Sequence, residues 1–390
     1  MKLSKIGLLP RIIIAIILGV LCGTFFPEWA VRCFVTFNSI FSHFLSFLIP
    51  LIIVGLVAPA IADIGRGAGK LLLITAVLAY GDTVFSGFMS YFVSTGIFPS
   101  LIDRSQAAQA VATVEELQPF FTIEIPPLLD VMSALIAAFV MGLGISFFES
   151  PTLKKGFDEF RDIIAKTIEV ALIPVLPLYI FSIFLNMSYS GQALRIISVF
   201  VAIIGVIFLM HIFLLLLQYC IAGALSGRNP FKMLYNMLPA YFTALGTSSS
   251  AATIPVTLKQ VKKNGVSDGI AGFVVPLCAT IHLSGSAMKI TACAVALLIM
   301  QGGTIDIAQF AGFILMLGVM MVAAPGVPGG AIMAALGVLQ SMLGFTAEQQ
   351  ALMIALYITM DSFGTACNVT GDGAIALVVD KIYGKNRATA

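Results

Sequence analysis

The sequence contains long apolar stretches near residues 7–27, 34–62, 70–99, 127–148, 162–188, 193–225, 268–300 and 347–382. A helix of about 20 apolar residues is long enough to cross a bilayer. Charged residues make up 10% of the 390 residues, against about 25% in soluble domains. The sequence therefore predicts an all-α polytopic membrane protein with eight transmembrane helices, several of them long enough to be tilted or broken.

The basic residues indicate how the chain is oriented. They cluster at Lys2, Lys5 and Arg11, at Arg66 and Lys70, at Lys154, Lys155 and Arg161, and at Lys381, Lys385 and Arg387. Because basic loops tend to stay on the cytoplasmic side, we expect both termini in the cytoplasm and the protein in the inner (cytoplasmic) membrane. Arg32, Arg104 and Arg195 lie on the opposite side, so the bias is incomplete. The N-terminus lacks a prominent cleavage site, which favours a retained first helix over a signal peptide.

The last apolar stretch, Ala355–Val379, carries polar residues at membrane depth. Asp361, Gly364, Asn368 and Asp372 follow a spacing that places them on one face of a helix. A carboxylate in hydrocarbon costs several kcal/mol, so such groups usually face a polar cavity. This stripe favours a binding site for a cation and a small ligand over a stripe satisfied only by neighbouring helices.

Two further segments are apolar but interrupted in the middle by residues that break helices. Segment 231–263 contains GTSSSAATIP at Gly246–Pro255, and segment 304–345 contains APGVPGG at Ala324–Gly330. Paired interrupted segments are typical of inverted repeats whose breaks meet at a substrate site. We therefore expect two re-entrant hairpins whose tips face the stripe from Asp361 to Asp372, rather than two loops in water.

Other polar residues lie in the third and seventh stretches. Asp82 interrupts the third, and Thr280, His282, Ser284, Ser286 and Lys289 lie in the seventh. The spacing of seven residues predicts that His282 and Lys289 share a helical face. A lysine at membrane depth needs a carboxylate or a ligand nearby.

These motifs resemble the dicarboxylate/amino acid:cation symporter family, which includes the glutamate transporters. The resemblance rests on Gly246–Pro255, Pro276–Ile281 (PLCATI), Gly326–Gly329 (GVPG) and Asn368–Asp372 (NVTGD), in the family's order and spacing. It covers essentially the whole chain and is strongest from Ala240 onward.

The resemblance implies an elevator-type homotrimer in which a transport domain moves against a scaffold. The scaffold would comprise helices 1–2 (1–69) and residues 100–192, which hold an outer loop (Ser100–Thr122) and helices 4–5. The transport domain would comprise helix 3 (70–99) and residues 193–390. The latter hold helix 6, the Ser-rich hairpin 231–263, helix 7 (268–300), the second hairpin 304–345 and helix 8 (347–382).

The resemblance also implies how an amino acid would bind. Asp361 would take its α-amino group and Asn368 its α-carboxylate, while the backbone near Ser248–Ser250 and Val327 would close over it. An ammonium pairs with a carboxylate, and a carboxylate accepts from amides and from N–H groups at helix starts. The predicted substrate set is Ser248, Ser249, Ser250, Thr280, Val327, Asp361, Gly364, Thr365 and Asn368.

Gly364 departs from the family members that transport acids, which carry an arginine there. Its absence favours a neutral or polar amino acid, because a guanidinium is the natural partner of a side-chain carboxylate. Lys289 stands where the family usually has tyrosine, and its ammonium is an alternative source of that charge. A glutamate, aspartate or dicarboxylate substrate therefore stays open.

The family's sodium-binding Asn-Met-Asp-Gly-Thr motif appears here as His282-Leu-Ser-Gly-Ser286, and Asp82 with Thr83 aligns with a hydroxyl ligand. Sodium prefers oxygen ligands, so we expect an Asp82–His282 pair in which protonated imidazole replaces the ion. Releasing that proton in each cycle would give proton coupling; keeping it would leave transport uncoupled or differently coupled. A further alternative is that His282 and Lys289 only neutralise Asp82 and Asp361. The predicted ion set is Asp82, Thr83, Cys278, His282, Ser284, Lys289, Asn368 and Asp372, with residual sodium at Asp372 and Na⁺ or H⁺ as coupling ion.

Other classes of protein fit the sequence less well. A channel would not need Asp361, and a hydrolase using Ser248–Ser250 with His282 lacks a nucleophile elbow and an oxyanion device. The six cysteines contain no CxxC pair, and the net charge of +2 gives no indication of a nucleic-acid partner. We expect no enzyme activity and no cofactor; the expected partners are an amino acid, lipid and two further copies of the chain.

Overall fold

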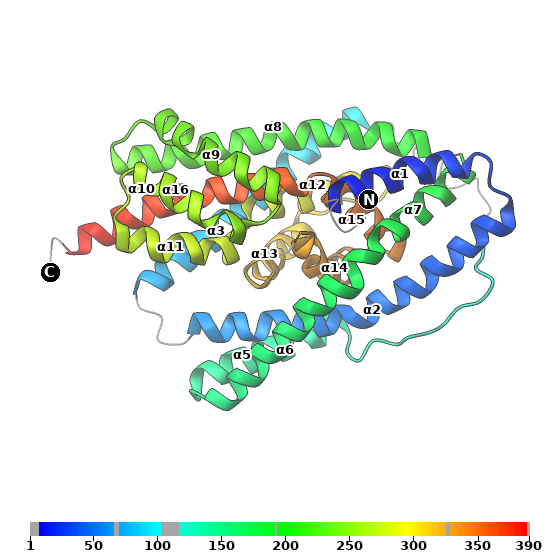
Figure 1. Ribbon diagram of the computed structural model, residues 1–390, viewed down its shortest axis with the longest axis horizontal. Coiled ribbons are helices and arrows are strands. Elements are labelled where there is room, and N and C mark those ends of the chain that lie inside the picture. Colours follow the sequence, from blue (N-terminus) through cyan, green and yellow to red (C-terminus); the bar gives the residue numbers. More distant parts are fainter. Residues whose placement is uncertain (1–7, 66–69, 103–116, 192, 325–327, 388–390) are drawn as a thin grey trace.

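The computed structural model describes residues 8–65, 70–102, 117–191, 193–324 and 328–387. Within these ranges the secondary structure is helical and contains no strand. The helices form an elongated bundle in which α8 runs along one long edge and α2 along the opposite one (Figure 1). The prediction of an all-α protein is confirmed for these residues.

The elements follow one another in this order: α1 (Leu8–Gly23), α2 (Glu28–Gly65), α3 (Lys70–Leu101), α5 (Val131–Phe147), α6 (Pro151–Thr167), the π-helical η2 (Ile168–Leu172), α7 (Ile173–Tyr189), α8 (Ala193–Ser226), α9 (Pro230–Thr247), α10 (Ser250–Lys263), α11 (Asp268–Ile281), α12 (Ser284–Met300), α13 (Ile307–Ala323), α14 (Gly330–Leu343), α15 (Ala347–Thr359) and α16 (Asp361–Arg387). Most of the predicted outer loop, 103–116, lies outside the described residues.

Among the described residues, five helical stretches are long and apolar enough to cross a membrane: 28–63, 70–101, 151–189, 199–226 and 268–300. The bent pair α15–α16 makes a sixth. The described part of α1 and helix α5 are apolar but shorter, at 16 and 17 residues. Several helices long enough to span a membrane are therefore present, as a polytopic membrane protein requires. By length and composition the described residues give up to six such spans, fewer than the eight predicted.

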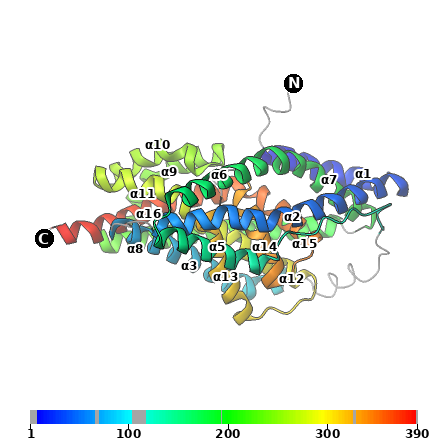
Figure 2. The ribbon, with the colours of Figure 1, turned by 90° about the horizontal axis from the view of Figure 1, so that it is seen from below.

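The first helices pack through small residues. Helix α1 lies along α7 (Figures 1 and 2), and the Ser188 hydroxyl of α7 donates to the Val20 carbonyl of α1 at 2.7 Å. A Cβ at Gly19 would lie 2.6 Å from the Phe181 carbonyl oxygen. Glycine at this position therefore sets how closely the two backbones approach, as small residues do between membrane helices.

Two of the predicted spans are each built from two helices. The seventh span breaks at His282 and Leu283, between α11 and α12. The eighth breaks at Met360, where α15 and α16 meet at 63°. The prediction that His282 and Lys289 share one helical face is therefore wrong, because His282 lies in the break and Lys289 lies inside α12.

The two interrupted segments form helix pairs, as their sequences predict. Helices α9 and α10 are separated by Ser248 and Ser249, and Ser248 adopts a left-handed conformation with φ of 51°. Helices α13 and α14 flank the second break, where Gly329 has φ of 76°. Residues 325–327 of that break lie outside the described residues. A helix pair followed by a broken helix thus occurs twice, first in α9–α12 and then in α13–α16.

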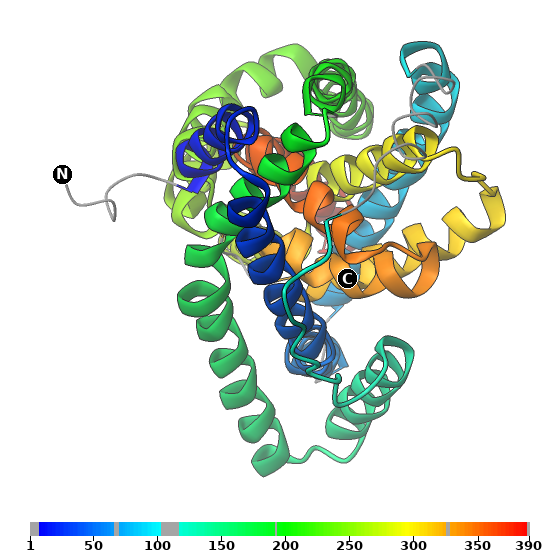
Figure 3. The ribbon, with the colours of Figure 1, turned by 90° about the vertical axis from the view of Figure 1, so that its right-hand side faces the viewer.

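Serine hydroxyls attach α3 to α12. Ser86 donates to the Ser284 carbonyl and Ser90 to the Met288 carbonyl, each at 2.8 Å. These hydroxyls are fully buried, so their hydrogen bonds fix the register of the two helices. The register places Asp82 of α3 beside the α11–α12 break. Seen end-on, the helices from the last quarter of the sequence lie in the middle of the molecule (Figure 3).

We expect Gly19→Leu to destabilise the protein, because the new side chain must push α7 away from α1. Overpacking of this kind costs about 1–3 kcal/mol. Thermal unfolding of the purified protein in detergent would measure the loss. Gly144→Leu is the matched control, because a Cβ at Gly144 of α5 meets nothing within 4 Å; equal losses in both variants would contradict the close approach at Gly19.

Candidate functional site

Four helices begin around one small cavity. Its lining residues are Ser248, Ser250, Ala279, Thr280, Leu283, Ser286, Ala324, Ala331, Tyr357, Asp361, Thr365 and Asn368. Four of them lie in the first turns of α10, α12, α14 and α16, namely Ser250, Ser286, Ala331 and Asp361. Helix N-termini carry unpaired N–H groups and partial positive charge. The cavity therefore favours an anionic group, with one carboxylate, Asp361, at its edge.

Asp361 connects this cavity to the second helix pair. It is the first residue of α16 and is 6% exposed. Its Oδ2 accepts a hydrogen bond from the Gly329 N–H at 2.8 Å. Its Oδ1 lies 3.7 Å from the Lys289 ammonium nitrogen, which is an ion-pair distance but too long for a hydrogen bond. Oδ1 therefore keeps room for another donor.

Lys289 neutralises Asp361 from behind the cavity. Its side chain is fully buried, and its ammonium donates to the Met360 carbonyl at 3.2 Å. The ammonium also lies 3.7 Å from the centre of the Tyr357 ring, in cation–π contact. Tyr357 lines the cavity, whereas Lys289 does not.

Gly364 provides the space that Lys289 occupies. A Cβ at Gly364 would overlap Cε and Nζ of Lys289. The lysine and the glycine therefore form a matched pair, and Gly364 does not line the cavity either.

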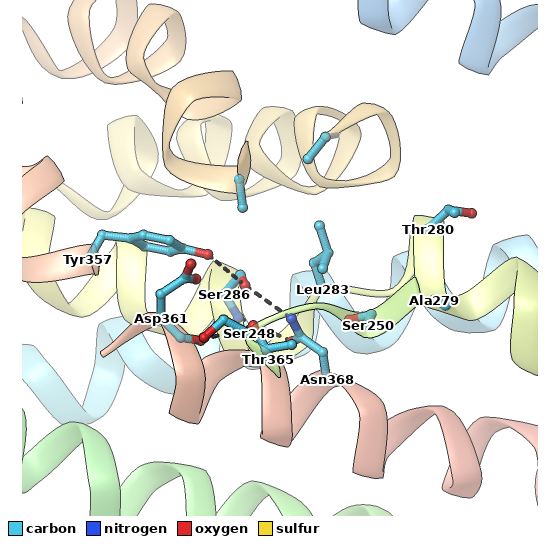
Figure 4. A pocket seen from close by; sticks show the side chains of 12 residues that line it. Ser248, Ser250, Ala279, Thr280, Leu283, Ser286, Tyr357, Asp361, Thr365 and Asn368 are labelled. Carbon is cyan, nitrogen blue, oxygen red and sulfur yellow. Dashed lines mark hydrogen bonds between the residues drawn. The ribbon is translucent and has the colours of Figure 1, made fainter. Parts of the chain in front are cut away.

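Asn368 completes a polar row along α16 toward the start of α12. Its Oδ1 accepts from the N–H groups of Gly285 at 2.8 Å and Ser286 at 3.3 Å. Its amide nitrogen donates to the Ser286 hydroxyl oxygen, which also accepts from the Tyr357 hydroxyl at 3.0 Å. Figure 4 shows Tyr357, Ser286 and Asn368 directed toward one another.

The remaining predicted substrate residues divide into three groups. Ser248, Ser250, Thr280 and Thr365 line the cavity, with Thr280 at the end opposite Tyr357 (Figure 4). Ser248 is also hydrogen-bonded to the Ser362 hydroxyl at 2.7 Å. Ser249 is absent from the lining and instead caps α10 by accepting from the Ala252 N–H. Val327 lies outside the described residues.

A second polar cluster lies between α3, α16 and the α11–α12 break. His282 Nε2 lies 2.7 Å from Asp82 Oδ2, and His282 Nδ1 lies 2.8 Å from Asp372 Oδ1. The imidazole is fully buried, Asp372 nearly so, and the Asp82 side chain is 16% exposed. The structure brings Asp82 and His282 into contact, as the sequence predicts, and adds Asp372 on the other ring nitrogen.

If both carboxylates are ionised, this arrangement sets the charge state that the imidazole needs. An ionised carboxylate only accepts hydrogen bonds, and a neutral imidazole donates from one nitrogen alone. Both contacts are satisfied together when both ring nitrogens carry a proton. The cluster therefore suits an imidazolium held between two carboxylates.

The other predicted ion residues surround this cluster. Ser284 Oγ lies 3.3 Å from the Gln218 amide nitrogen. Cys278 is fully buried, and its carbonyl accepts from the His282 N–H at 2.9 Å. Thr83 is also buried, with no hydrogen-bond partner for its hydroxyl. The described part of the chain contains no group of three or more His, Cys, Asp or Glu side chains arranged to hold a metal ion.

Several residues of these clusters are missing from the predicted sets, among them Gln218, Ser286 and Tyr357. Gln218 of α8 donates from its amide nitrogen to Asp82 Oδ2 at 2.6 Å, and Tyr357 of α15 covers Lys289. Gln218 follows four leucines. A single amide in an apolar helix is the sequence signal that could have pointed to a buried polar role for this residue. Tyr357 looks like an ordinary apolar-span residue, and the sequence offers no signal for it.

We expect Lys289→Met to destabilise the protein, because it leaves Asp361 as a buried charge without a cation. Removing one partner of a buried ion pair costs about 3–5 kcal/mol. The double variant Lys289→Met with Asp361→Asn should recover much of that loss, because both charges are gone. Thermal unfolding of the four proteins of this cycle would measure the coupling; additive losses would contradict a Lys289–Asp361 pair.

Comparison with known proteins identifies the family of the chain. The chain is 25% identical to a serine/threonine transporter, SstT, of Acinetobacter baumannii, over 97% of both chains. It is 26% identical to the SstT of Acinetobacter baylyi, over 97% of this chain and 98% of the relative. It is also 32% identical to human excitatory amino acid transporter 2 over 178 residues, which cover 45% of this chain and 30% of that protein. The sodium:dicarboxylate symporter family model matches residues 8–382, so the chain belongs to that family.

Proposed function

We propose that the protein is a symporter that carries a small neutral or polar amino acid across the cytoplasmic membrane together with a cation. The single observation that supports this most strongly is the cavity at which four helices begin and where Asp361 and Asn368 lie. Helix N-termini suit the α-carboxylate of an amino acid. Asp361 Oδ1, 3.7 Å from the Lys289 ammonium nitrogen, suits the α-ammonium group of the substrate.

The cavity also supports a neutral side chain on the substrate. None of the described residues that line it carries a positive charge, and the Lys289 ammonium, which contacts the Tyr357 ring, is not among the lining side chains. A guanidinium or ammonium facing the cavity would be the expected partner of a second carboxylate on the substrate. Two of the relatives are named as serine/threonine transporters, which fits a small hydroxyl-bearing substrate.

An acidic substrate is the alternative. The family's description refers to dicarboxylates, and one relative is an excitatory amino acid transporter. For this chain, such a substrate would require Lys289 to leave the Tyr357 ring and reach the cavity.

We further propose that the α9–α10 and α13–α14 pairs are re-entrant hairpins, and that the second is the outer gate. The hydrogen bond from Gly329 to Asp361 supports this, because it connects the hairpin to the predicted ammonium partner. In this proposal residues 1–69 and 100–192 form a scaffold, and residues 70–99 and 193–390 form a transport domain. Three copies assemble through their scaffolds, the transport domain moves as an elevator, and both termini are cytoplasmic.

The geometry gives no support to the hydrolase alternative. A serine nucleophile needs a free base beside it, but both nitrogens of His282 face carboxylates. Ser248 instead contacts the Ser362 hydroxyl. The relatives are named as transporters, and the protein is not an enzyme.

We expect Asp361→Asn to abolish measurable amino-acid binding, because the amide cannot pair with the ammonium group of the substrate. Removing one partner of a buried charge pair costs about 2–5 kcal/mol, or roughly 30- to 4,000-fold in Kd. Calorimetric titration of the purified protein with L-serine and L-threonine would measure the loss.

Two controls separate binding from stability in that experiment. Asp162→Asn removes an exposed acid on α6, whose side chain is 75% exposed, and should leave the affinity unchanged. The double variant Asp361→Asn with Lys289→Met restores charge balance and should still fail to bind. Normal affinity in the double variant would show that Asp361 does not hold the substrate.

We expect Gly364→Arg to give a well-folded protein only when Lys289 is replaced as well, because the lysine occupies the space beside Gly364. The double variant Gly364→Arg with Lys289→Tyr should prefer L-aspartate over L-serine, since its guanidinium can bind a second carboxylate. Competition between labelled serine and unlabelled aspartate would measure the preference. An unchanged preference in a folded double variant would place the side-chain pocket elsewhere.

A further inference from the structure

We propose that His282 and Lys289 are resident cations that take the place of a coupling sodium ion, so that the protein binds its amino acid without sodium. This inference rests on the proposed amino-acid transport. It concerns whether the cation of the proposed symport is sodium, the ion that the family's description names.

Each acid at membrane depth near the cavity contacts a cationic side chain of the chain, with three carboxylates sharing two cations. Asp82 and Asp372 share the imidazole of His282, at 2.7 and 2.8 Å. Asp361 has the ammonium of Lys289 at 3.7 Å. Both cationic side chains are fully buried. They are therefore part of the packed interior and do not reach in from the protein surface.

The site expected to retain sodium, at Asp372, does not fit the ion in this structure. Sodium needs oxygen ligands with free lone pairs pointing at it. Asp372 Oδ1 faces the His282 Nδ1, and Asn368 Oδ1 accepts from two N–H groups of α12. Oxygens already facing N–H donors are poorly placed to surround a cation as well.

Two buried oxygens near the cluster do lack partners, those of the Thr83 hydroxyl and the Gln218 amide. They do not make a sodium site by themselves, because hard cations held by oxygens typically gather about six ligands. The carboxylate between them, Asp82, already receives His282 Nε2 and the Gln218 amide on a single oxygen.

Thermodynamic linkage predicts how sodium should affect amino-acid affinity if the two were coupled. If sodium and the amino acid were coupled in binding, sodium would raise amino-acid affinity, and the amino acid would raise sodium affinity by the same factor. Coupled ligands typically change each other's affinity by roughly 5- to 150-fold. With resident cations in place, we expect no such change.

The direct test uses the wild-type protein in detergent. L-serine is titrated calorimetrically in sodium chloride and in choline chloride of equal ionic strength, and thermal unfolding is recorded in both salts without amino acid. The proposal predicts equal serine affinity and equal unfolding temperatures. A serine affinity at least about fivefold higher in sodium, or unfolding at a higher temperature in sodium alone, would overturn it.

A variant tests the same idea in the opposite direction. His282→Asn leaves Asp82 and Asp372 facing a space lined by oxygens, and sodium should then take the place of the imidazolium. We expect the variant to unfold at a higher temperature in sodium than in choline, and its serine affinity to rise roughly 5- to 150-fold with sodium. A folded variant indifferent to sodium would count against the proposal.

His211→Asn is the matched control for that variant. His211 of α8 is also buried, but its Nε2 lies 3.3 Å from the Gly285 carbonyl oxygen rather than beside a carboxylate, so its loss should create no response to sodium.

If His282→Asn does not fold, the comparison of the wild-type protein in sodium and in choline still tests the proposal. Failure of L-serine, L-threonine and L-aspartate to bind in either salt would reject the proposed function instead, whereas binding that strengthens in sodium would reject only this inference.

Discussion

Charge neutralisation at membrane depth is the constraint on which the rest of this structure depends. An unpaired carboxylate there costs several kcal/mol, and three acids lie near the centre of the helical bundle. Two cationic side chains contact these acids. His282 lies between Asp82 and Asp372, and the Lys289 ammonium lies near Asp361. These pairs join α3, α11, α12 and α16, so the charges that a transporter needs for binding also hold its central helices together.

Helix breaks supply the other half of the site. A helix that stops in the membrane leaves N–H groups without partners, which is tolerated only where protein or a polar cavity surrounds them. Here the starts of α10, α12, α14 and α16 meet at one cavity, and Asn368 caps the start of α12. The breaks that make these four segments poor membrane spans therefore concentrate partial positive charge opposite a single carboxylate.

Much of the fold could be predicted from the sequence because apolar stretches and helix-breaking motifs act locally. The breaks at Ser248–Ser249 and near Gly329 lie within the motifs that predict them. The Asp82–His282 contact could be predicted because, by the family resemblance, both residues replace uncharged ligands of one sodium site with groups that attract each other. Broken spans were expected, but the positions of the breaks at His282 and Met360 were not predicted, because neither position is itself a proline or a glycine. One helical face was therefore wrongly expected for His282 and Lys289. Gln218 and Tyr357 reach the site only through packing between distant helices.

Lys289 lies where it can balance the charge of Asp361 without taking the place of a substrate at Asp361 Oδ1. Its ammonium lies over the Tyr357 ring and near Asp361 Oδ1, but at 3.7 Å it does not occupy that oxygen with a short hydrogen bond. Asp361 Oδ1 thus keeps its capacity to accept from a substrate ammonium group. An arginine at position 364 would present its charge to the ligand instead. Glycine at 364 leaves space for the lysine, whose ammonium contacts the Tyr357 ring. In the proposed binding mode, these three residues would keep a positive charge near Asp361 and away from the substrate's side chain.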